Sequence, residues 1–216
     1  MKGKVCIMND SSGNSATNPE KNMRNEILEV TAQLFRKKGF TGTSMQDIAN
    51  EVGILKGSIY YYFNSKNEIF RKVLDKGIGP VLKNAEFIMN KKLSPQDKLQ
   101  ELLQSHLQYI LKNDFSLVIF FREKENIPAN ETQKYVQSRN RYENIFRDVL
   151  EEGINKGYFP KVDVNLTIFA ILGMCNWVIQ WYNPRGSKNQ EEITAHMIYL
   201  ICELMLNPDK KETDKK

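Results

Sequence analysis

The chain has 216 residues, enough for one large or two small domains with a substantial buried core. Its formal net charge of +5 excludes a nonspecific polycation, and its three cysteines do not have the spacing of a metal site. The odd number of cysteines and the lack of a secretion-type apolar segment after residues 1–8 favour a reducing cytoplasm. We expect no helix that spans a membrane.

The two ends of the chain differ from its middle. Residues 1–20 are rich in Ser, Asn and Gly and are predicted to be a disordered arm, and residues 208–216 are predicted to be a disordered tail. Between them, apolar residues recur with helical spacing and no segment alternates convincingly as a strand. The sequence therefore predicts an all-α protein with about nine helices.

The first two predicted helices have clear boundaries. One covers about residues 22–38. The next begins after Ser44, because Ser44 and Asp47 have the spacing of a capping pair. Apolar residues within 45–52 then share one face, and Gly53 follows where a left-handed C-cap is expected.

A short third helix begins near Lys56, and only Ile59 and Phe63 have the spacing of core contacts. Six polar, small or aromatic residues remain for another role: Lys56, Gly57, Ser58, Tyr60, Tyr61 and Tyr62. Lysine can pair with a phosphate or with guanine, glycine permits close approach of backbones, and hydroxyl groups reach phosphate oxygens. The pair of helices therefore predicts a helix–turn–helix that enters the major groove of DNA, with two ordinary surface helices as the alternative.

A fourth helix is predicted directly afterwards, because Ser65 and Glu68 form another capping pair. Lys66 in its first turn is unfavourable beside the positive end of a helix dipole, and a phosphate at that end would explain it. Lys and Arg outnumber Asp and Glu between residues 36 and 76, which suits a phosphate surface. We expect this helix to bend or end near residues 77–80, which contain two glycines and a proline. It would link the helix–turn–helix region, here called the head, to the rest of the chain.

Five further helices complete the expected fold. The first of them begins after Ser94, and the second covers residues 117–121. The third covers residues 131–155, the fourth covers residues 164–182 after the cap Asp163, and the fifth begins near Gln190. His106 lies on an apolar stripe and is expected to be a hydrogen-bonded packing residue. The helix over 164–182 is apolar almost all round, so we predict a homodimer through the last two helices. A well-filled monomeric core is the alternative.

Residues 24–76 resemble the DNA-binding domain of the tetracycline-repressor (TetR) family. The residues that carry the resemblance are Ile27-Leu28, Ala32, Leu34-Phe35, Lys38-Gly39-Phe40, Thr43-Ser44, Asp47-Ile48-Ala49, Val52-Gly53-Ile54, Lys56-Gly57-Ser58-Ile59-Tyr60, Phe63, Ser65-Lys66 and Leu74. The resemblance implies DNA contacts at Thr43, Lys56, Gly57, Ser58, Tyr60, Tyr61, Tyr62 and Lys66. The family usually has Ser or Thr where this chain has Leu55, which cannot cap the recognition helix or hold a phosphate, and often His at Tyr62. The resemblance to the TetR family also implies a DNA-binding head over residues 21–76 and a ligand-binding and dimerisation domain over residues 77–207.

Part of the C-terminal region is similar to the signature of TetR regulators of fatty-acid and steroid catabolism, which respond to acyl-CoA thioesters. The residues that carry this similarity are Gly173-Met174-Cys175-Asn176-Trp177, Trp181-Tyr182-Asn183-Pro184, Gly186 and Glu191-Glu192-Ile193. This second resemblance implies an acyl-CoA or a similar amphipathic effector, which needs an apolar tunnel and cations for its phosphates. The candidate ligand residues are Phe120, Phe121, Arg122, Tyr142, Phe146, Phe169, Met174, Asn176 and Trp177. Arg139 and Arg141 are further candidates for the phosphates.

The expected function is therefore a cytoplasmic, dimeric transcription repressor that binds a palindromic operator in double-stranded DNA and is released by an apolar or acyl-CoA-type effector. We predict no catalytic residues, metal or cofactor, and no enzyme, because the sequence lacks the common nucleophile, phosphate-loop and zinc motifs. Two alternatives remain. One is a repressor of the same family that senses aromatic cations through an acid such as Glu123 or Glu143. The other is an apolar-ligand carrier with no DNA role.

Overall fold

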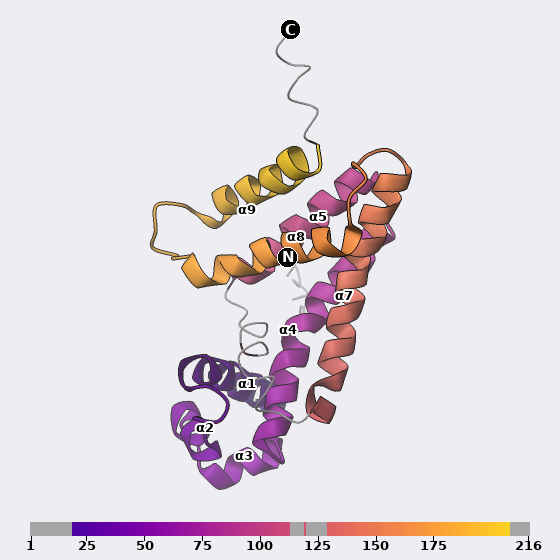
Figure 1. Ribbon diagram of the computed structural model, residues 1–216. Coiled ribbons are helices and arrows are strands. Elements are labelled where there is room, and N and C mark those ends of the chain that lie inside the picture. Colours follow the sequence, from indigo (N-terminus) through magenta and orange to yellow (C-terminus); the bar gives the residue numbers. More distant parts are fainter. Residues whose placement is uncertain (1–18, 113–118, 120–128, 208–216) are drawn as a thin grey trace, which may run out of the picture.

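The computed structural model describes residues 19–112, 119 and 129–207, and all its regular secondary structure in these ranges is helical (Figure 1). The predicted all-α class is confirmed. The helix expected over residues 117–121 lies outside the described residues except for Ile119, and so do the predicted tail and all but the last two residues of the predicted arm.

Four helices build the N-terminal head. They are α1 (Pro19–Lys38), α2 (Met45–Val52), α3 (Lys56–Tyr62) and the first turns of α4 (Lys66–Met89). Their shared core is aromatic: the ring centroids of Phe35, Phe40 and Phe70 lie 5.2 to 5.9 Å apart in tilted and edge-to-face pairs. The core thus joins α1, the turn that follows it and α4.

The long helix α4 corrects one expectation from the sequence. An end near residues 77–80 is wrong, because α4 continues to Met89 with Pro80 inside it. A proline inside a helix removes one backbone hydrogen bond, but packing here outweighs that loss: Ile78 and Val81 are buried, and α4 packs against both α5 and α7. The boundary that we placed between residues 76 and 77 therefore falls within a single helix that runs from the head into the body.

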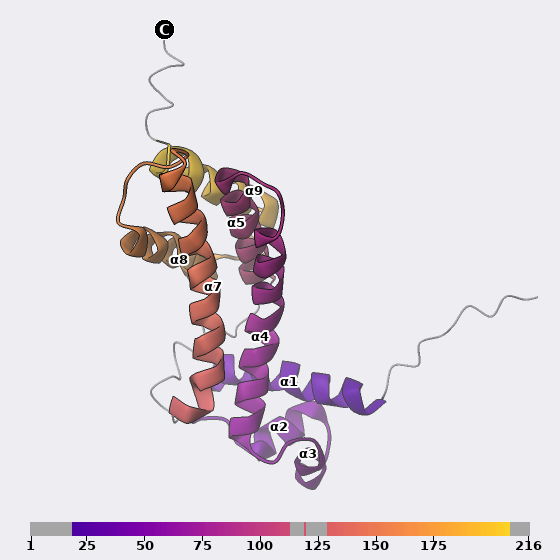
Figure 2. The ribbon, with the colours of Figure 1, turned by 90° about the vertical axis from the view of Figure 1, so that its right-hand side faces the viewer.

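The body consists of the rest of α4 and four more helices. These are α5 (Pro95–Leu111), α7 (Ala129–Asn155), α8 (Val164–Trp181) and α9 (Gln190–Tyr199), which continues as the π-helix η1 (Leu200–Met205). The long helices α4 and α7 run side by side away from the head, and α8 and α9 lie at their far end (Figures 1 and 2). The predicted caps are confirmed at Ser94 and Asp163, whose side chains accept hydrogen bonds from backbone N–H groups of the first turn.

Helix α8 has an uncovered apolar face. Over its 18 residues the mean hydropathy is 1.4, so by length and composition alone it would qualify to cross a membrane, as core helices of soluble proteins also do. In this fold it packs against α5 and α7 through one side. On its other side Leu166, Trp177 and Trp181 are between 52% and 67% exposed, and Phe169 at the margin of this face is 61% exposed. The single chain therefore leaves one apolar face of this helix uncovered.

Replacement of Gly153 by alanine tests the packing at the end of α7. A methyl group at this position would overlap the ring of Phe159, which is buried against it. We expect Gly153→Ala to lower the free energy of unfolding by about 1–3 kcal/mol, as overpacking does. Gly57→Ala is the matched control, because its methyl group would meet no atom within 4 Å, and it should leave stability unchanged or raise it by up to about 1 kcal/mol. Urea titration at one protein concentration measures both, and equal stability of the two variants would contradict this packing.

Candidate functional site

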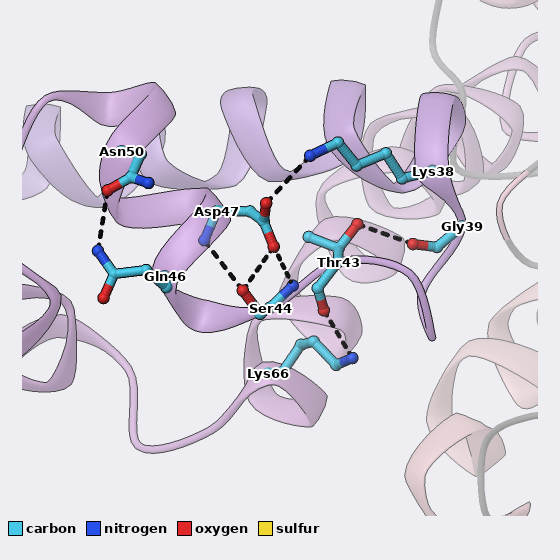
Figure 3. A network of polar contacts seen from close by, with 8 residues as sticks. All are labelled: Lys38, Gly39, Thr43, Ser44, Gln46, Asp47, Asn50 and Lys66. Atoms are coloured by element: carbon cyan, nitrogen blue, oxygen red, sulfur yellow. Dashed lines mark hydrogen bonds and ion pairs between the residues drawn. The ribbon is translucent and has the colours of Figure 1, made fainter.

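The turn between α1 and α2 is held by a network of charged and polar groups (Figure 3). The Ser44 hydroxyl accepts a hydrogen bond from the backbone N–H of Asp47 at 3.1 Å, and the Asp47 carboxylate accepts one from the Ser44 N–H at 2.9 Å. Lys38 Nζ lies 3.0 Å from the same carboxylate. The hydrogen bonds from Ser44, followed by the one from Lys38, hold the pKa of Asp47 well below its ordinary value. The predicted capping box is confirmed.

The turn between α2 and α3 depends on Gly53. This residue has φ +82°, and its N–H donates to the carbonyl of Ala49 at 3.0 Å, so it forms the predicted left-handed C-cap. Helix α3 then starts at Lys56, and its N-cap residue Leu55 makes no side-chain capping hydrogen bond, as expected from the sequence. The Leu55 side chain is 80% exposed.

Helix α3 presents most of its surface to solvent. Ile59 and Phe63 are buried and anchor it to the head, as predicted. The exposed positions are Lys56, Gly57, Ser58, Tyr60 and Tyr61, the last with 73% of its surface open. Tyr62 is only half-buried and packs edge-to-face against Tyr61 at 5.1 Å between centroids. Five of the six residues singled out on this helix therefore form one open surface, with Tyr62 at its margin.

Thr43 and Lys66 occupy a different place from these five. Thr43 is buried, and its hydroxyl donates to the Gly39 carbonyl at 2.8 Å. Lys66 Nζ donates to the Thr43 carbonyl at 2.8 Å (Figure 3). It also donates to the Phe40 carbonyl at 2.7 Å and lies 4.2 Å from the centroid of the Phe40 ring. The unfavourable position of this cation at the start of α4 is thus offset by two carbonyl dipoles within the protein. Both residues hold the α1–α2 turn against α4.

A cavity of about 290 Å³ lies in the body between four helices. Its walls come from α4 (Ile78 and Val81), α5 (His106 and Tyr109), α7 (Arg139, Tyr142 and Glu143) and α8 (Phe169, Leu172, Gly173 and Asn176). Most of the exposed surface of these walls is apolar, and an ion pair between two of the described lining residues joins Arg139 Nε to Glu143 Oε1 at 3.1 Å. The walls that the described residues form therefore combine apolar surface with one pair of opposite charges.

The structure places the predicted ligand residues in three groups. Tyr142, Phe169 and Asn176 line the cavity. Phe146 is fully buried behind it, Met174 is half-buried away from it, and Trp177 is 65% exposed on the open face of α8. The predicted ligand residues Phe120, Phe121 and Arg122 lie outside the described residues.

His106 was expected only as a packing residue, and it also lines this cavity. Its Nδ1 lies 3.0 Å from the hydroxyl oxygen of Tyr142, and its Nε2 lies 3.2 Å from Oδ1 of Asn176. Burial lowers the pKa of His106 to about 4, so the ring is neutral at pH 7. Sequence reasoning also missed Ile78 and Val81, although their spacing of three places them on one face of α4.

The head and the body of this fold each match a known protein family. Residues 27–73 match the family described as bacterial regulatory proteins, tetR family, and residues 92–205 match the tetracyclin repressor-like C-terminal domain. The HTH-type transcriptional repressor KstR2 of Mycobacterium tuberculosis is 29% identical over 181 residues, which cover 82% of this chain and 90% of that protein.

Two solved structures extend this likeness. The TetR family regulator PfmR from Thermus thermophilus has a TM-score of 0.74 and 30% identity, covering 82% of this chain and 97% of that one. AibR in complex with isovaleryl coenzyme A and operator DNA has a TM-score of 0.76 over 83% of this chain and 98% of its own. At 20% identity the second likeness concerns the fold alone.

Substitution of Lys66 tests whether this cation supports the head from inside. Lys66→Met keeps much of the apolar stem but leaves two carbonyls without their charged donor, so we expect it to lower the free energy of unfolding by about 2 kcal/mol. Lys56→Met removes an exposed cation and should change it by less than about 0.5 kcal/mol. Urea denaturation measures both variants. Equal effects at the two lysines would contradict the internal role of Lys66.

Proposed function

Because the chain belongs to the TetR family of helix–turn–helix transcriptional regulators, we propose that it is a cytoplasmic repressor that binds a palindromic operator as a dimer and leaves it when an acyl-CoA-type effector enters the body cavity. The observation that carries this proposal is the course of α4. Its first half buries Phe70 and Leu74 in the head, and Ile78 and Val81 then line the cavity. An effector in the cavity thus touches the helix that supports the recognition helix.

The open surface of α3 is the proposed DNA contact. Lys56 pairs with phosphate or guanine, Ser58, Tyr60 and Tyr61 reach phosphates through their hydroxyls, and Gly57 allows the helix to approach the DNA backbone. Exposure of all five positions supports this assignment. Thr43 and Lys66 act through the shape of the turn, since their polar atoms bind carbonyls within the head. Tyr62 steadies Tyr61 from its half-buried position.

The exposed face of α8 is the proposed centre of the dimer. It offers Leu166, Phe169, Trp177 and Trp181, and Tyr199 at the end of α9 adds an aromatic group that is 46% exposed. A soluble monomer rarely leaves such a continuous apolar face in water, and a two-fold interface would cover it with a second copy. A two-fold dimer also matches a palindromic operator, with its two recognition helices spaced by roughly 34–36 Å.

An acyl thioester suits the cavity better than an aromatic cation. Glu143 is the acid that would attract a cation, but its carboxylate is already paired with Arg139. The described walls therefore carry no net negative charge. Ile78, Val81 and Leu172 provide apolar walls that suit an acyl chain. AibR, which has this fold, holds isovaleryl coenzyme A in its solved structure.

Release requires that the effector favour one conformation over another. It shifts the equilibrium only if it binds the DNA-incompetent arrangement of α4 more tightly than the competent one. The geometry of the cavity is compatible with such a preference, since its walls come from α4 as well as from α5, α7 and α8. A displacement of α4 at the level of Ile78 is carried to the head by a continuous helix.

Two alanine variants test the DNA surface. Lys56→Ala should weaken operator binding and lower the slope of log affinity against log salt by about 1, because one phosphate contact is lost. Gly57→Ala adds a methyl group that meets nothing in the free protein, so it should fold normally and still lose operator affinity by about tenfold or more. Fluorescence anisotropy at several salt concentrations measures both. Lys92→Ala, an exposed lysine outside the head, is the control and should change neither quantity.

Charge placed on α8 tests the dimer. Trp177→Glu introduces a carboxylate at the centre of the proposed interface, so sedimentation at micromolar concentration should show a monomer, and operator affinity should fall with it. Phe87→Glu is the matched control on α4, because Phe87 is 62% exposed and Trp177 is 65% exposed. That control should remain a dimer. A monomeric wild-type protein, or a dimer that survives Trp177→Glu, would contradict the proposed interface.

A further inference from the structure

Three polar side chains from three helices meet at one wall of the body cavity. They are Tyr142 of α7, His106 of α5 and Asn176 of α8, and all three line the cavity. The imidazole bridges the other two, at 3.0 Å from the Tyr142 hydroxyl oxygen and 3.2 Å from Asn176 Oδ1. The rings of His106 and Tyr142 stack with an interplanar angle of 20°, and Phe146 packs edge-on against both. Aromatic packing therefore fixes where the two hydrogen bonds point.

The direction of each hydrogen bond follows from the chemistry of the groups. His106 is neutral, since burial lowers its pKa to about 4, so its ring carries one N–H and one lone pair. An amide oxygen accepts hydrogen bonds and cannot donate them, which places the N–H on Nε2, toward Asn176 Oδ1. The lone pair then lies on Nδ1, and the Tyr142 hydroxyl must donate to it. The chain runs from Tyr142 through His106 to Asn176.

This direction leaves the amide NH₂ of Asn176 without an acceptor. Its oxygen is occupied by His106, and no residue in the described ranges accepts a hydrogen bond from its nitrogen. The amide is partly buried and lies beside the apolar Leu172 and next to Gly173 in the cavity wall. A donor at a cavity wall that has no partner among the described residues can bind water or a ligand. A ligand that supplies an acceptor there makes a hydrogen bond that an apolar ligand cannot make.

We propose that the Asn176 amide binds a carbonyl oxygen of the effector, and that His106 and Tyr142 are positioning residues that hold the amide with its N–H groups toward the ligand. This inference rests on the proposed function, and it specifies the effector further: in an acyl thioester the group that is recognised is the acyl carbonyl. An amide N–H can donate a hydrogen bond but cannot accept one, so the ligand atom that faces it must be a hydrogen-bond acceptor. A hydrocarbon or a thioether at the same place leaves the amide unsatisfied.

The tautomer of His106 tests the network without any ligand. The chain has two histidines, so nitrogen-15 histidine labelling gives two ring systems, and His196→Gln assigns them. We expect the neutral Nε2–H form of His106 in the wild-type protein at pH 7. Asn176→Leu removes the acceptor that holds the proton on Nε2 and should weaken this preference, because the remaining Tyr142 hydroxyl can either donate or accept. The Nδ1–H form, or a protonated ring at pH 7, would overturn the inference and leave the proposed DNA-binding function untouched.

A matched pair of ligands tests the carbonyl itself. Isovaleryl-CoA and its thioether analogue S-(3-methylbutyl)-CoA share the chain and the nucleotide and differ in one oxygen. By calorimetry we expect the wild-type protein to bind the thioester about tenfold or more tightly, the value of a lost hydrogen bond to a buried donor. Asn176→Leu should bind the two equally, and the ratio cancels any change in cavity shape. Tyr142→Phe should reduce the preference while its thioether affinity stays the same.

The other outcomes are distinguishable. Equal binding of both ligands by the wild-type protein would overturn the carbonyl contact and leave the effector class standing. If the protein bound neither ligand and still bound its operator, the acyl-CoA effector itself would fail, and the inference with it. Operator binding by each variant reports that it is folded.

Discussion

The structure depends on one helix that belongs to two cores. The first half of α4 buries Phe70 and Leu74 in the head, and its second half buries Ile78 and Val81 in the body. Because close-packed interiors resist gradual deformation, a change of packing on one side of such a helix moves it as a unit. In the proposed function, the position of the recognition helix therefore depends on what occupies a cavity in another part of the molecule.

Two polar groups stabilise the parts that this helix joins. In the head, Lys66 binds the carbonyls of Phe40 and Thr43 and so fastens the α1–α2 turn to the start of α4. In the body, His106 links α7 to α8 through Tyr142 and Asn176. In the head, the acceptors of Lys66 are backbone carbonyls of the protein itself, so this network stabilises the fold. The network in the body leaves a donor at the cavity, which is the arrangement expected at a site that awaits a ligand.

Local signals in the sequence predicted the helices well, whereas contacts between distant residues were not predictable. Capping pairs such as Ser44 with Asp47 act within one turn, so they located helix starts correctly. Lys66 was different, because its acceptors lie 23 and 26 residues away along the chain, although its conflict with the helix dipole did indicate a missing partner. The helix end predicted near Pro80 was also wrong because of distant contacts, since packing against other helices decides whether α4 continues.

The central claim is that α4 transmits ligand binding from the cavity to the head. The distance between the two heads of the dimer tests this claim most directly. A spin label at Glu51, an exposed position on α2, attached through an unnatural amino acid, reports that distance in the dimer by pulsed electron resonance. The account predicts that a thioester that releases the operator shifts the distance distribution by several ångströms away from the one measured on DNA, where the recognition helices are spaced by roughly 34–36 Å. Release of the operator with an unchanged distribution would contradict the transmission of ligand binding through α4.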